Sequence, residues 1–265
     1  MNEVKRYFDA SQGRLLYIGS EATNEYWDEH WATDKFEKAL KTKSYFVSRV
    51  TKRHLPLGSR ILEGGCGQGD KVYTLKQMGY NSVGLDFAEA TVKQIKSVAP
   101  ELEIVLGDVR ELPFKDGEFD GYWSIGVIEH FYEGYDPILS EMARVIKPGG
   151  KLFLTFPAMS RFRRLKSFFN FYNKFEAQES SPKGFYQFAL NVGKTTEDLR
   201  ALGFTVVEEK YFDGLKGFKD ELPLIKPLVQ KLYDSRNFFA RATKAVFNII
   251  FSWMFGHSVL LVCKR

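Results

Sequence analysis

The segment Ile61–Asp70, with the sequence ILEGGCGQGD, constrains the fold of this 265-residue chain most strongly. A short apolar run ends in an acid, Glu63, and glycines then occupy every second position from Gly65 to Gly69. The apolar residues that follow have helical spacing until Gly79. The pattern predicts a strand, a tight turn and a helix. Bare glycine backbone and free helical N–H groups would let an anionic or polar ligand approach closely.

Alternating strand and helix patterns continue from this segment. We expect further strands at 83–86, 104–108, 119–125, 151–156, 204–209 and 258–263, most of them separated by helices. Strands joined by helices form parallel sheets, whose ligands bind at the carboxyl ends of the strands. The expected fold class is therefore α/β.

Two acids follow strands at this expected binding edge. Asp86 lies 21 residues after Gly65 and ends the second strand, close to the spacing of about 20 at which an acid binds ribose hydroxyls. Asp108 ends the third strand, where it would face the next part of the same ligand. Alternatively, Asp86 caps the following helix and Asp108 stabilises a turn.

Composition indicates a globular protein, with 44% hydrophobic and 27% charged residues. The only two cysteines, Cys66 and Cys263, are too few for a disulfide scaffold, so a reducing, cytoplasmic location is expected. The first residues lack the apolar stretch of a signal peptide, so none is expected.

Aromatic and basic residues concentrate in the C-terminal part. Residues 158–265 carry 18 Lys and Arg against 10 Asp and Glu, whereas residues 1–157 carry 20 against 23.

Two segments, 158–195 and 211–256, interrupt the strand pattern. A narrow polar stripe from Gln230 to Ser252 predicts one long helix or two broken ones there, with wide apolar faces. The apolar run is too short to span a membrane, but it would suit peripheral contact with an anionic membrane surface. Packing against the protein itself or a second subunit is the alternative.

Five motifs in a fixed order carry a resemblance to a known family over Arg60–Phe156. They are the glycine turn after Glu63, Asp86, Gly107-Asp108, Ile128-Glu129-His130 after the fourth strand, and Lys147-Pro148-Gly149-Gly150. Together they resemble class I S-adenosylmethionine-dependent methyltransferases, particularly the subgroup of quinone-biosynthesis and small-molecule methyltransferases. The resemblance implies a Rossmann-like seven-stranded, mostly parallel sheet that ends in an antiparallel hairpin. A helical N-terminal cap at 1–56, which could lie across the mouth of the site, is predicted separately from the roughly helical spacing of Tyr26, Trp27, Trp31 and Phe36. The cofactor-binding domain is expected at 57–265, with acceptor-side insertions at 158–195 and 211–256.

The resemblance further implies which residues hold S-adenosylmethionine. The glycine turn would bind the methionine part with Glu63 orienting its amino group, Asp86 would bind the ribose, and Phe87, Asp108 and Val109 would contact the adenine. Ser124, Ile125 and Gly126 would lie near the transferring methyl group. The complete expected set is Glu63, Gly65, Cys66, Gly67, Gly69, Asp86, Phe87, Asp108, Val109, Ser124, Ile125 and Gly126.

Two departures from related families narrow the chemistry. Relatives that bind a metal carry Glu-x-x-Glu-His after the fourth strand, but here Gly126 replaces the first glutamate, so no metal is expected. Enzymes that methylate amino groups of nucleic-acid bases carry an Asn- or Asp-Pro-Pro-aromatic run, which Ser124–Val127 does not match.

The expected reaction is methyl transfer to a small-molecule or lipid-linked acceptor, with an acidic group favoured by the basic insertions. A hydroxyl oxygen is the expected target, and His130 is the candidate general base because histidine titrates near neutral pH. His130 could instead pack or contact the cofactor. The oligomeric state stays open.

Four alternative functions remain. Carbon methylation of a quinone-like ring would need no strong base. A silent S-adenosylmethionine-binding scaffold would keep the same cofactor residues. A nicotinamide oxidoreductase is disfavoured because the turn reads Gly-x-Gly-x-Gly. A nucleic-acid binder could use the basic, aromatic run from Arg161 to Phe175, although such runs more often form lids or interfaces.

Overall fold

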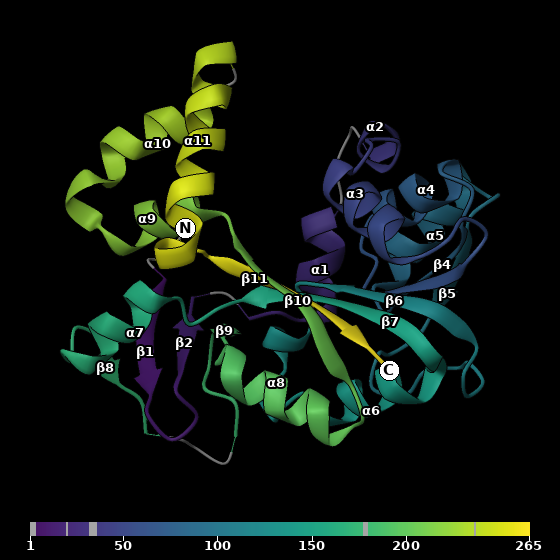
Figure 1. Ribbon diagram of the computed structural model, residues 1–265, viewed down its shortest axis with the longest axis horizontal. Coiled ribbons are helices and arrows are strands. Elements are labelled where there is room, and N and C mark those ends of the chain that lie inside the picture. The colour runs from purple at the N-terminus through teal and green to yellow at the C-terminus, as the bar shows by residue number, and fades with distance from the viewer. Residues whose placement is uncertain (1–3, 20, 32–35, 177–179, 236) are drawn as a thin grey trace.

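A seven-stranded sheet forms the centre of the computed structural model, which describes residues 4–19, 21–31, 36–176, 180–235 and 237–265 (Figure 1). The strand order is β10-β11-β7-β6-β3-β4-β5. The strands are β3 (Arg60–Gly64), β4 (Asn81–Asp86), β5 (Glu103–Leu106), β6 (Phe119–Ile125), β7 (Ile146–Pro157), β10 (Thr205–Phe212) and β11 (Ser258–Lys264). The first five pair in parallel, whereas β11 is antiparallel to both β7 and β10. The predicted α/β fold and its closing hairpin are confirmed.

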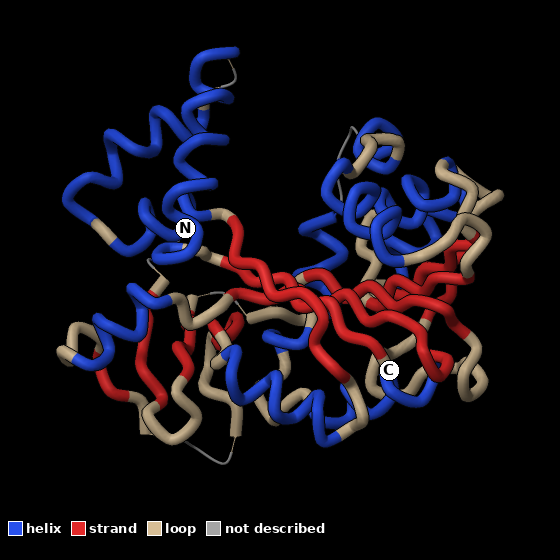
Figure 2. The backbone as a smooth tube through the Cα atoms, in the orientation of Figure 1, coloured by secondary structure: helices blue, strands red, loops and turns tan. Residues whose placement is uncertain are grey.

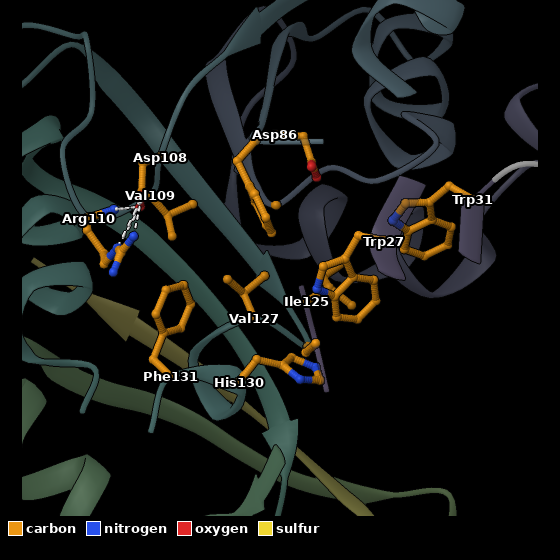
Figure 3. A pocket seen from close by; sticks show the side chains of 14 residues that line it. Trp27, Trp31, Asp86, Asp108, Val109, Arg110, Ile125, Val127, His130 and Phe131 are labelled. Carbon is orange, nitrogen blue, oxygen red and sulfur yellow. Dashed lines mark hydrogen bonds and ion pairs between the residues drawn. The ribbon is translucent and has the colours of Figure 1, made fainter. Parts of the chain in front are cut away.

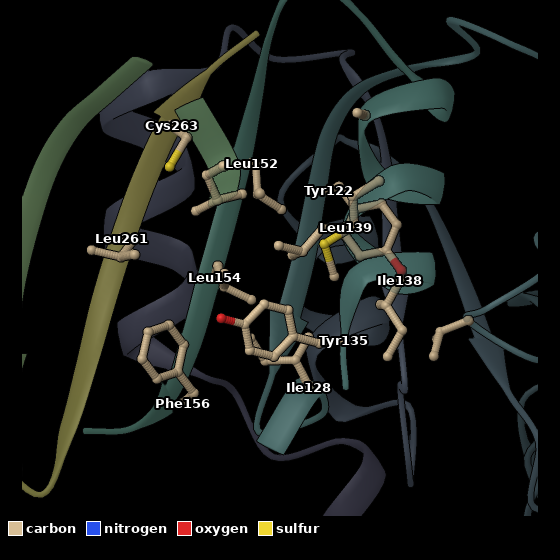
Figure 4. Close-up of a cluster of buried hydrophobic side chains, with 14 of the residues drawn as sticks. Tyr122, Ile128, Tyr135, Ile138, Leu139, Leu152, Leu154, Phe156, Leu261 and Cys263 are labelled. Carbon is tan, nitrogen blue, oxygen red and sulfur yellow. The ribbon is translucent and has the colours of Figure 1, made fainter. Parts of the chain in front are cut away.

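Helices cover both faces of this sheet. They are α3 (Tyr45–His54), α4 (Asp70–Gln77) and α5 (Glu89–Val98) on one face, and α6 (Asp136–Val145) and α8 (Val192–Ala201) on the other (Figures 1 and 2). Adjacent strand residues point to opposite faces, so Ile61 packs against the α3 and α4 side while Leu62 packs against the α6 side. The apolar cluster on the α6 side, which contains Leu62, also includes Leu139 and Leu154 (Figure 4).

A second sheet with the strand order β8-β1-β2-β9 lies beside the first. Its strands are β1 (Lys5–Asp9), β2 (Arg14–Ile18), β8 (Asn173–Lys174) and β9 (Phe185–Ala189). The expectation of a wholly helical segment at 1–56 is therefore wrong for residues 5–18. There, Asp9 accepts hydrogen bonds from Ser11 N and Gln12 N, and Gly13 takes a φ of 61°, which together build a turn between two strands.

The remaining helices belong to the N-terminal segment and to the insertions. They are α1 (Asn24–Trp31), α2 (Phe36–Leu40), α7 (Arg161–Phe168), α9 (Gly214–Glu221), α10 (Lys226–Asp234) and α11 (Phe238–Phe255), with short 3₁₀ turns η1 (Ile128–His130) and η2 (Pro223–Ile225). The polar stripe from Gln230 to Ser252 lies on two helices, α10 and α11, which agrees with the second of the two expected arrangements, and α9 precedes them in the same insertion. None of the helices in the described part of the chain is both long and apolar enough to cross a bilayer.

Candidate active site

The turn between β3 and α4 depends on glycine at three positions. Gly65, Gly67 and Gly69 have φ angles of 74°, 49° and 75°, a region that side chains with a Cβ rarely adopt. Gly65 N donates a hydrogen bond to Leu85 O at 2.8 Å, so the turn is fixed to the end of β4. The alternate glycines therefore reflect backbone geometry.

Close packing provides a second reason for these glycines. A Cβ on Gly65 would lie 2.5 Å from Cγ2 of Val127, and one on Gly67 would lie 2.8 Å from the ring of Trp31. Both distances are shorter than ordinary contacts between carbon atoms. The turn is thus a cradle of bare backbone beneath Val127, which follows β6, and Trp31 of α1.

A cavity of about 370 Å³ opens beside this cradle, within the size range of small-ligand sites. It lies at the carboxyl ends of β3, β4 and β6, as parallel sheets predict. Figure 3 shows its labelled side chains, which come from α1, from the ends of β4 and β6, and from the loops after β5 and β6. The lining residues are Ala22, Trp27, Trp31, Gly65, Asp86, Phe87, Asp108, Val109, Arg110, Ile125, Gly126, Val127, His130 and Phe131.

Asp86 ends β4 at the cavity wall and is buried. Its Oδ2 accepts a hydrogen bond from Gly67 N at 2.7 Å, and its Oδ1 accepts one from Ala88 N at 2.9 Å. Burial raises the pKa of Asp86, and these backbone hydrogen bonds oppose that rise. Helix α5 starts after Ala88 without a side-chain cap, so Asp86 fixes the turns before the helix rather than capping it, and its second lone pairs can still accept from a ligand.

Asp108 lies at the cavity mouth beside Arg110, a residue that sequence reasoning missed. Arg110 Nη2 lies 2.6 Å from Asp108 Oδ2, and its guanidinium stands 5.3 Å from the centre of the Phe131 ring (Figure 3). Despite partial burial, hydrogen bonds from Arg110 lower the pKa of Asp108. The cavity mouth therefore carries an ion pair of Asp108 and Arg110. In the sequence, only the position of Arg110 two residues after Asp108 could have indicated its role.

Glu63 is buried behind the glycine turn, outside the cavity lining. Burial raises the pKa of Glu63 to about 8, although Lys71 opposes the rise. Its Oε2 has no hydrogen-bond partner among the described residues. A buried carboxyl oxygen without a partner is costly, so this atom suits a ligand that brings a donor, such as an ammonium group.

Two other residues of the expected cofactor set also lie behind the cavity. Ser124 is fully buried, and its Oγ lacks a partner within the described part of the chain. Cys66 is buried in the cluster with Val72 and Ile95, and burial raises the pKa of its thiol. The Cys66 side chain therefore contributes packing, and only its backbone belongs to the turn.

His130 lines the cavity from the end of η1. Its Nδ1 lies 2.6 Å from the carbonyl oxygen of Tyr186 on β9. A carbonyl only accepts, so Nδ1 carries the proton and Nε2 holds the lone pair. Burial lowers the pKa of His130 to about 4, although the bond to Tyr186 opposes the shift. The imidazole is consequently neutral at physiological pH.

Aromatic residues of α1 cover one side of the cavity. The Trp27 ring meets the His130 ring edge-on at 5.0 Å and stacks with Trp31 at 6.0 Å (Figure 3). Sequence reasoning placed both tryptophans on a leading helix that could cross the mouth of the site. The structure brings them to the cavity, where they would exclude water from bound ligands.

Of the expected cofactor residues, seven line the cavity: Gly65, Asp86, Phe87, Asp108, Val109, Ile125 and Gly126. Glu63, Cys66, Gly67, Gly69 and Ser124 lie behind it or within the turn. The lining residues Ala22, Val127 and Phe131 were not foreseen, because none carries a distinctive motif. No cluster of three or more His, Cys, Asp or Glu side chains able to hold a metal occurs within the described ranges.

Comparisons with known proteins agree with this geometry. Residues 62–154 match the family model described as "Methyltransferase domain". The chain is 29% identical over 153 residues to a probable S-adenosylmethionine-dependent methyltransferase from Mycolicibacterium smegmatis, covering 58% of this chain and 54% of that one. It is 32% identical over 133 residues to the demethylmenaquinone methyltransferase of Lysinibacillus sphaericus, covering 47% and 56%. The chain thus spans about half the length of these curated relatives.

A solved structure gives a likeness over nearly the whole chain. It is the 1,6-didemethyltoxoflavin-N1-methyltransferase of Burkholderia thailandensis with bound 1,6-didemethyltoxoflavin and S-adenosylhomocysteine. The TM-score is 0.55 at 14% identity, covering 98% of this chain and 99% of that one, so the likeness concerns the fold. The glycine cradle and the strand-end acids of this site all lie within residues 62–154, the part of the chain that matches the methyltransferase domain.

Proposed function

We propose that this protein transfers a methyl group from S-adenosylmethionine to a hydroxyl oxygen of a small-molecule or lipid-linked acceptor. The observation that carries the proposal is the glycine cradle with the unpartnered Glu63 oxygen behind it, opening onto a cavity that also holds His130. The cradle suits a cofactor with an amino acid part, and the remaining cavity suits an acceptor.

Each part of the cofactor has a complementary group in the site. The glycine turn would hold the carboxylate end with backbone N–H groups, while Glu63 accepts from the ammonium group. Asp86 would accept from the ribose hydroxyls through its second lone pairs, and Phe87 and Val109 would enclose the adenine. Bound there, S-adenosylmethionine would supply an activated methyl group to the acceptor.

Alignment is the main contribution that the protein makes to such a transfer. Holding the two reactants in line can supply about 7–11 kcal/mol of the barrier. Trp27 and Trp31 would limit the acceptor to orientations that face the glycine turn. The aromatic walls would also exclude water, which competes as an acceptor.

His130 is proposed as the general base. Because its Nδ1–H is held by the Tyr186 carbonyl, Nε2 is left with the lone pair that could take the hydroxyl proton during transfer. Its pKa of about 4 keeps the imidazole unprotonated throughout the physiological range, and it also makes Nε2 a weaker base than that of an exposed histidine. General base assistance of this kind typically contributes about 10²–10⁴-fold in rate.

Carbon methylation of a quinone-like ring is the second candidate. The aromatic cavity lining suits a flat ring, and a relative is named as a demethylmenaquinone methyltransferase. That reaction would place less demand on His130. A catalytically silent scaffold would retain the cofactor cradle without turnover.

An acceptor screen tests the proposal. The purified protein is incubated with S-adenosylmethionine carrying a labelled methyl group and with phenols, hydroxylated lipids, fatty acids and reduced quinones. We expect a methyl ether or ester from a hydroxyl-bearing acceptor, and a kcat about 10²–10⁴-fold lower in His130→Gln with unchanged cofactor affinity. A ring-methylated product that forms equally well with His130→Gln would establish the second candidate. Cofactor binding without turnover on any class would contradict both enzyme proposals.

A further inference from the structure

Helix α11 exposes its most apolar side. At about 100° per residue, Phe238, Phe239, Val246, Ile249, Ile250 and Trp253 fall within an arc of about 120°. All six side chains are exposed, and Phe239 and Ile249 are 81% and 82% accessible. Water-soluble surfaces rarely present so many large apolar side chains together, and such patches mark interaction sites.

Two polar residues of the same helix, Asn248 and Ser252, face inward. Ser252 Oγ accepts a hydrogen bond from Gly214 N, and Asn248 Oδ1 accepts one from Leu215 N, both in the first turn of α9. These bonds satisfy backbone donors that a helix leaves free at its start. The bonds fix the rotation of α11, so its apolar arc cannot turn toward the protein without breaking them.

Neighbouring elements extend the apolar surface. Leu165, Phe168, Phe169 and Phe171 in and after α7, and Leu224 and Leu228 in and after η2, are exposed. Phe162 of α7 packs against Phe255 of α11 with ring centres 4.6 Å apart. Figure 1 shows α10 and α11 projecting from the sheet on the same side as α1. We call the exposed parts of α7, α10 and α11 the helical docking surface.

Positive charge accompanies this surface. Helices α7, α10 and α11 contain eight Lys and Arg residues and one acid, Asp234. Arg161, Arg164, Lys226, Lys231 and Arg241 are exposed. Arg161 places its guanidinium 5.3 Å from the centre of the Trp253 ring, so an amphipathic aromatic and a cation stand together at the edge of the apolar arc.

We infer that the helical docking surface binds an anionic lipid membrane. Apolar side chains flanked by exposed cations are complementary to acyl chains below a layer of negative headgroups. A second copy of this chain fits less well, because pairing the surface with itself would bring like charges together.

The position of the surface relates it to the cavity. Helix α11 leads directly into β11, whose first residue, Ser258, pairs with Pro157 at the carboxyl end of β7. Gly126 N donates to Thr155 O at the same edge of the sheet. A membrane on this surface would therefore lie on the cavity side of the sheet. The inference concerns binding alone and does not depend on methyl transfer.

Vesicle co-sedimentation tests the inference. We expect the full chain to bind vesicles of equimolar phosphatidylglycerol and phosphatidylcholine, to bind phosphatidylcholine alone weakly, and to dissociate as NaCl rises. We also expect a blue shift of tryptophan emission that Trp253→Phe removes.

Matched variants separate the apolar and charged contributions. Phe239→Glu with Ile249→Glu should abolish binding, and Lys231→Gln with Arg241→Gln should weaken it about fivefold per charge removed. The control is Leu57→Glu. Leu57 is 69% exposed and lies just before β3, at the amino ends of the parallel strands and so opposite the cavity. Unchanged circular dichroism and Tm would verify that each variant folds.

Two outcomes would overturn the inference. One is the absence of any preference for anionic vesicles in the wild-type chain. The other is a concentration-dependent dimer that Phe239→Glu with Ile249→Glu disrupts while vesicle binding stays absent, which would assign the surface to a second copy.

Discussion

Arg163 on α7 and Glu221 at the end of α9 form an ion pair of 2.9 Å in which both side chains are only 1% exposed. Glu221 also accepts from Tyr172 at 2.6 Å, and pairs with Lys166 at 2.9 Å and with Arg6 of β1 at 2.7 Å. One buried carboxylate thus joins the N-terminal hairpin to both insertions. Arg163 and Arg6 lower the pKa of Glu221 to about 2 against the effect of burial.

Removing this carboxylate should strongly destabilise the protein. Glu221→Gln leaves buried cations without a counter-charge, and we expect the free energy of unfolding to fall by about 3–5 kcal/mol in denaturant titrations. Glu37→Gln is the control, because Glu37 forms an exposed pair with Lys41 one helical turn away. We expect that control to change stability by less than about 0.5 kcal/mol. Equal losses in the two variants would contradict the role of Glu221.

The contribution of the same ion pair to the free energy of unfolding should depend on pH. The pKa of Glu221 is lower in the folded protein than in the unfolded chain, so its stabilisation is complete above about pH 4.5 and is lost as the pH falls toward 2. The stability difference between wild type and Glu221→Gln should therefore shrink over that window. A difference that stays constant would show that the carboxylate does not remain ionised.

The pH profile of the reaction should lack the usual histidine inflection. Because burial lowers the pKa of His130 to about 4, the base is already unprotonated at pH 5.5. We expect kcat/KM for the best acceptor to fall only near pH 4, where His130 becomes protonated. An inflection near pH 6.5 that disappears in His130→Gln would contradict this assignment.

Cofactor binding should release a proton from Glu63. Its pKa of about 8 keeps the side chain mostly neutral at pH 7, whereas contact with an ammonium group would favour the ionised form. Calorimetric titrations in buffers of different ionisation enthalpy should detect this proton, and affinity should rise between pH 6 and 8. The Glu63→Gln variant should bind the cofactor more weakly and should release no proton when it binds. Unchanged proton release in that variant would contradict the contact.

The central fold could be predicted because its signals are local. Apolar runs followed by glycine or acid mark the strands, and the predicted fourth strand coincides with β6. The hairpin of β1 and β2 was missed although its turn, with Asp9 and Gly13, is a local signal, whereas its flanking strands β8 and β9 come from far along the chain and could not be foreseen. The aromatic residues with helical spacing, Tyr26, Trp27, Trp31 and Phe36, do lie in α1 and α2.

The site was only partly predictable for the same reason. Strand-end acids and the glycine turn follow from spacing, whereas the Arg110 pair with Asp108 and the bond from His130 to Tyr186 require tertiary structure. Helical periodicity correctly indicated a polar stripe on α11. It could not indicate that Asn248 and Ser252 turn inward to bind α9, which leaves the apolar arc exposed.

Cofactor binding by a pair of glycine variants tests the central claim most directly. Gly65 and Gly79 both have positive φ angles, 74° and 88°, so alanine strains the backbone at either position. Only at Gly65 would the new Cβ lie at the cavity, 2.5 Å from Val127, whereas nothing lies within 4 Å at Gly79.

In calorimetric titration with S-adenosylhomocysteine, we expect wild type and Gly79→Ala to bind with similar affinity and Gly65→Ala to lose detectable binding. Circular dichroism would verify that both variants fold. Failure of the wild-type protein to bind, or equal binding by Gly65→Ala, would contradict the cofactor site described above.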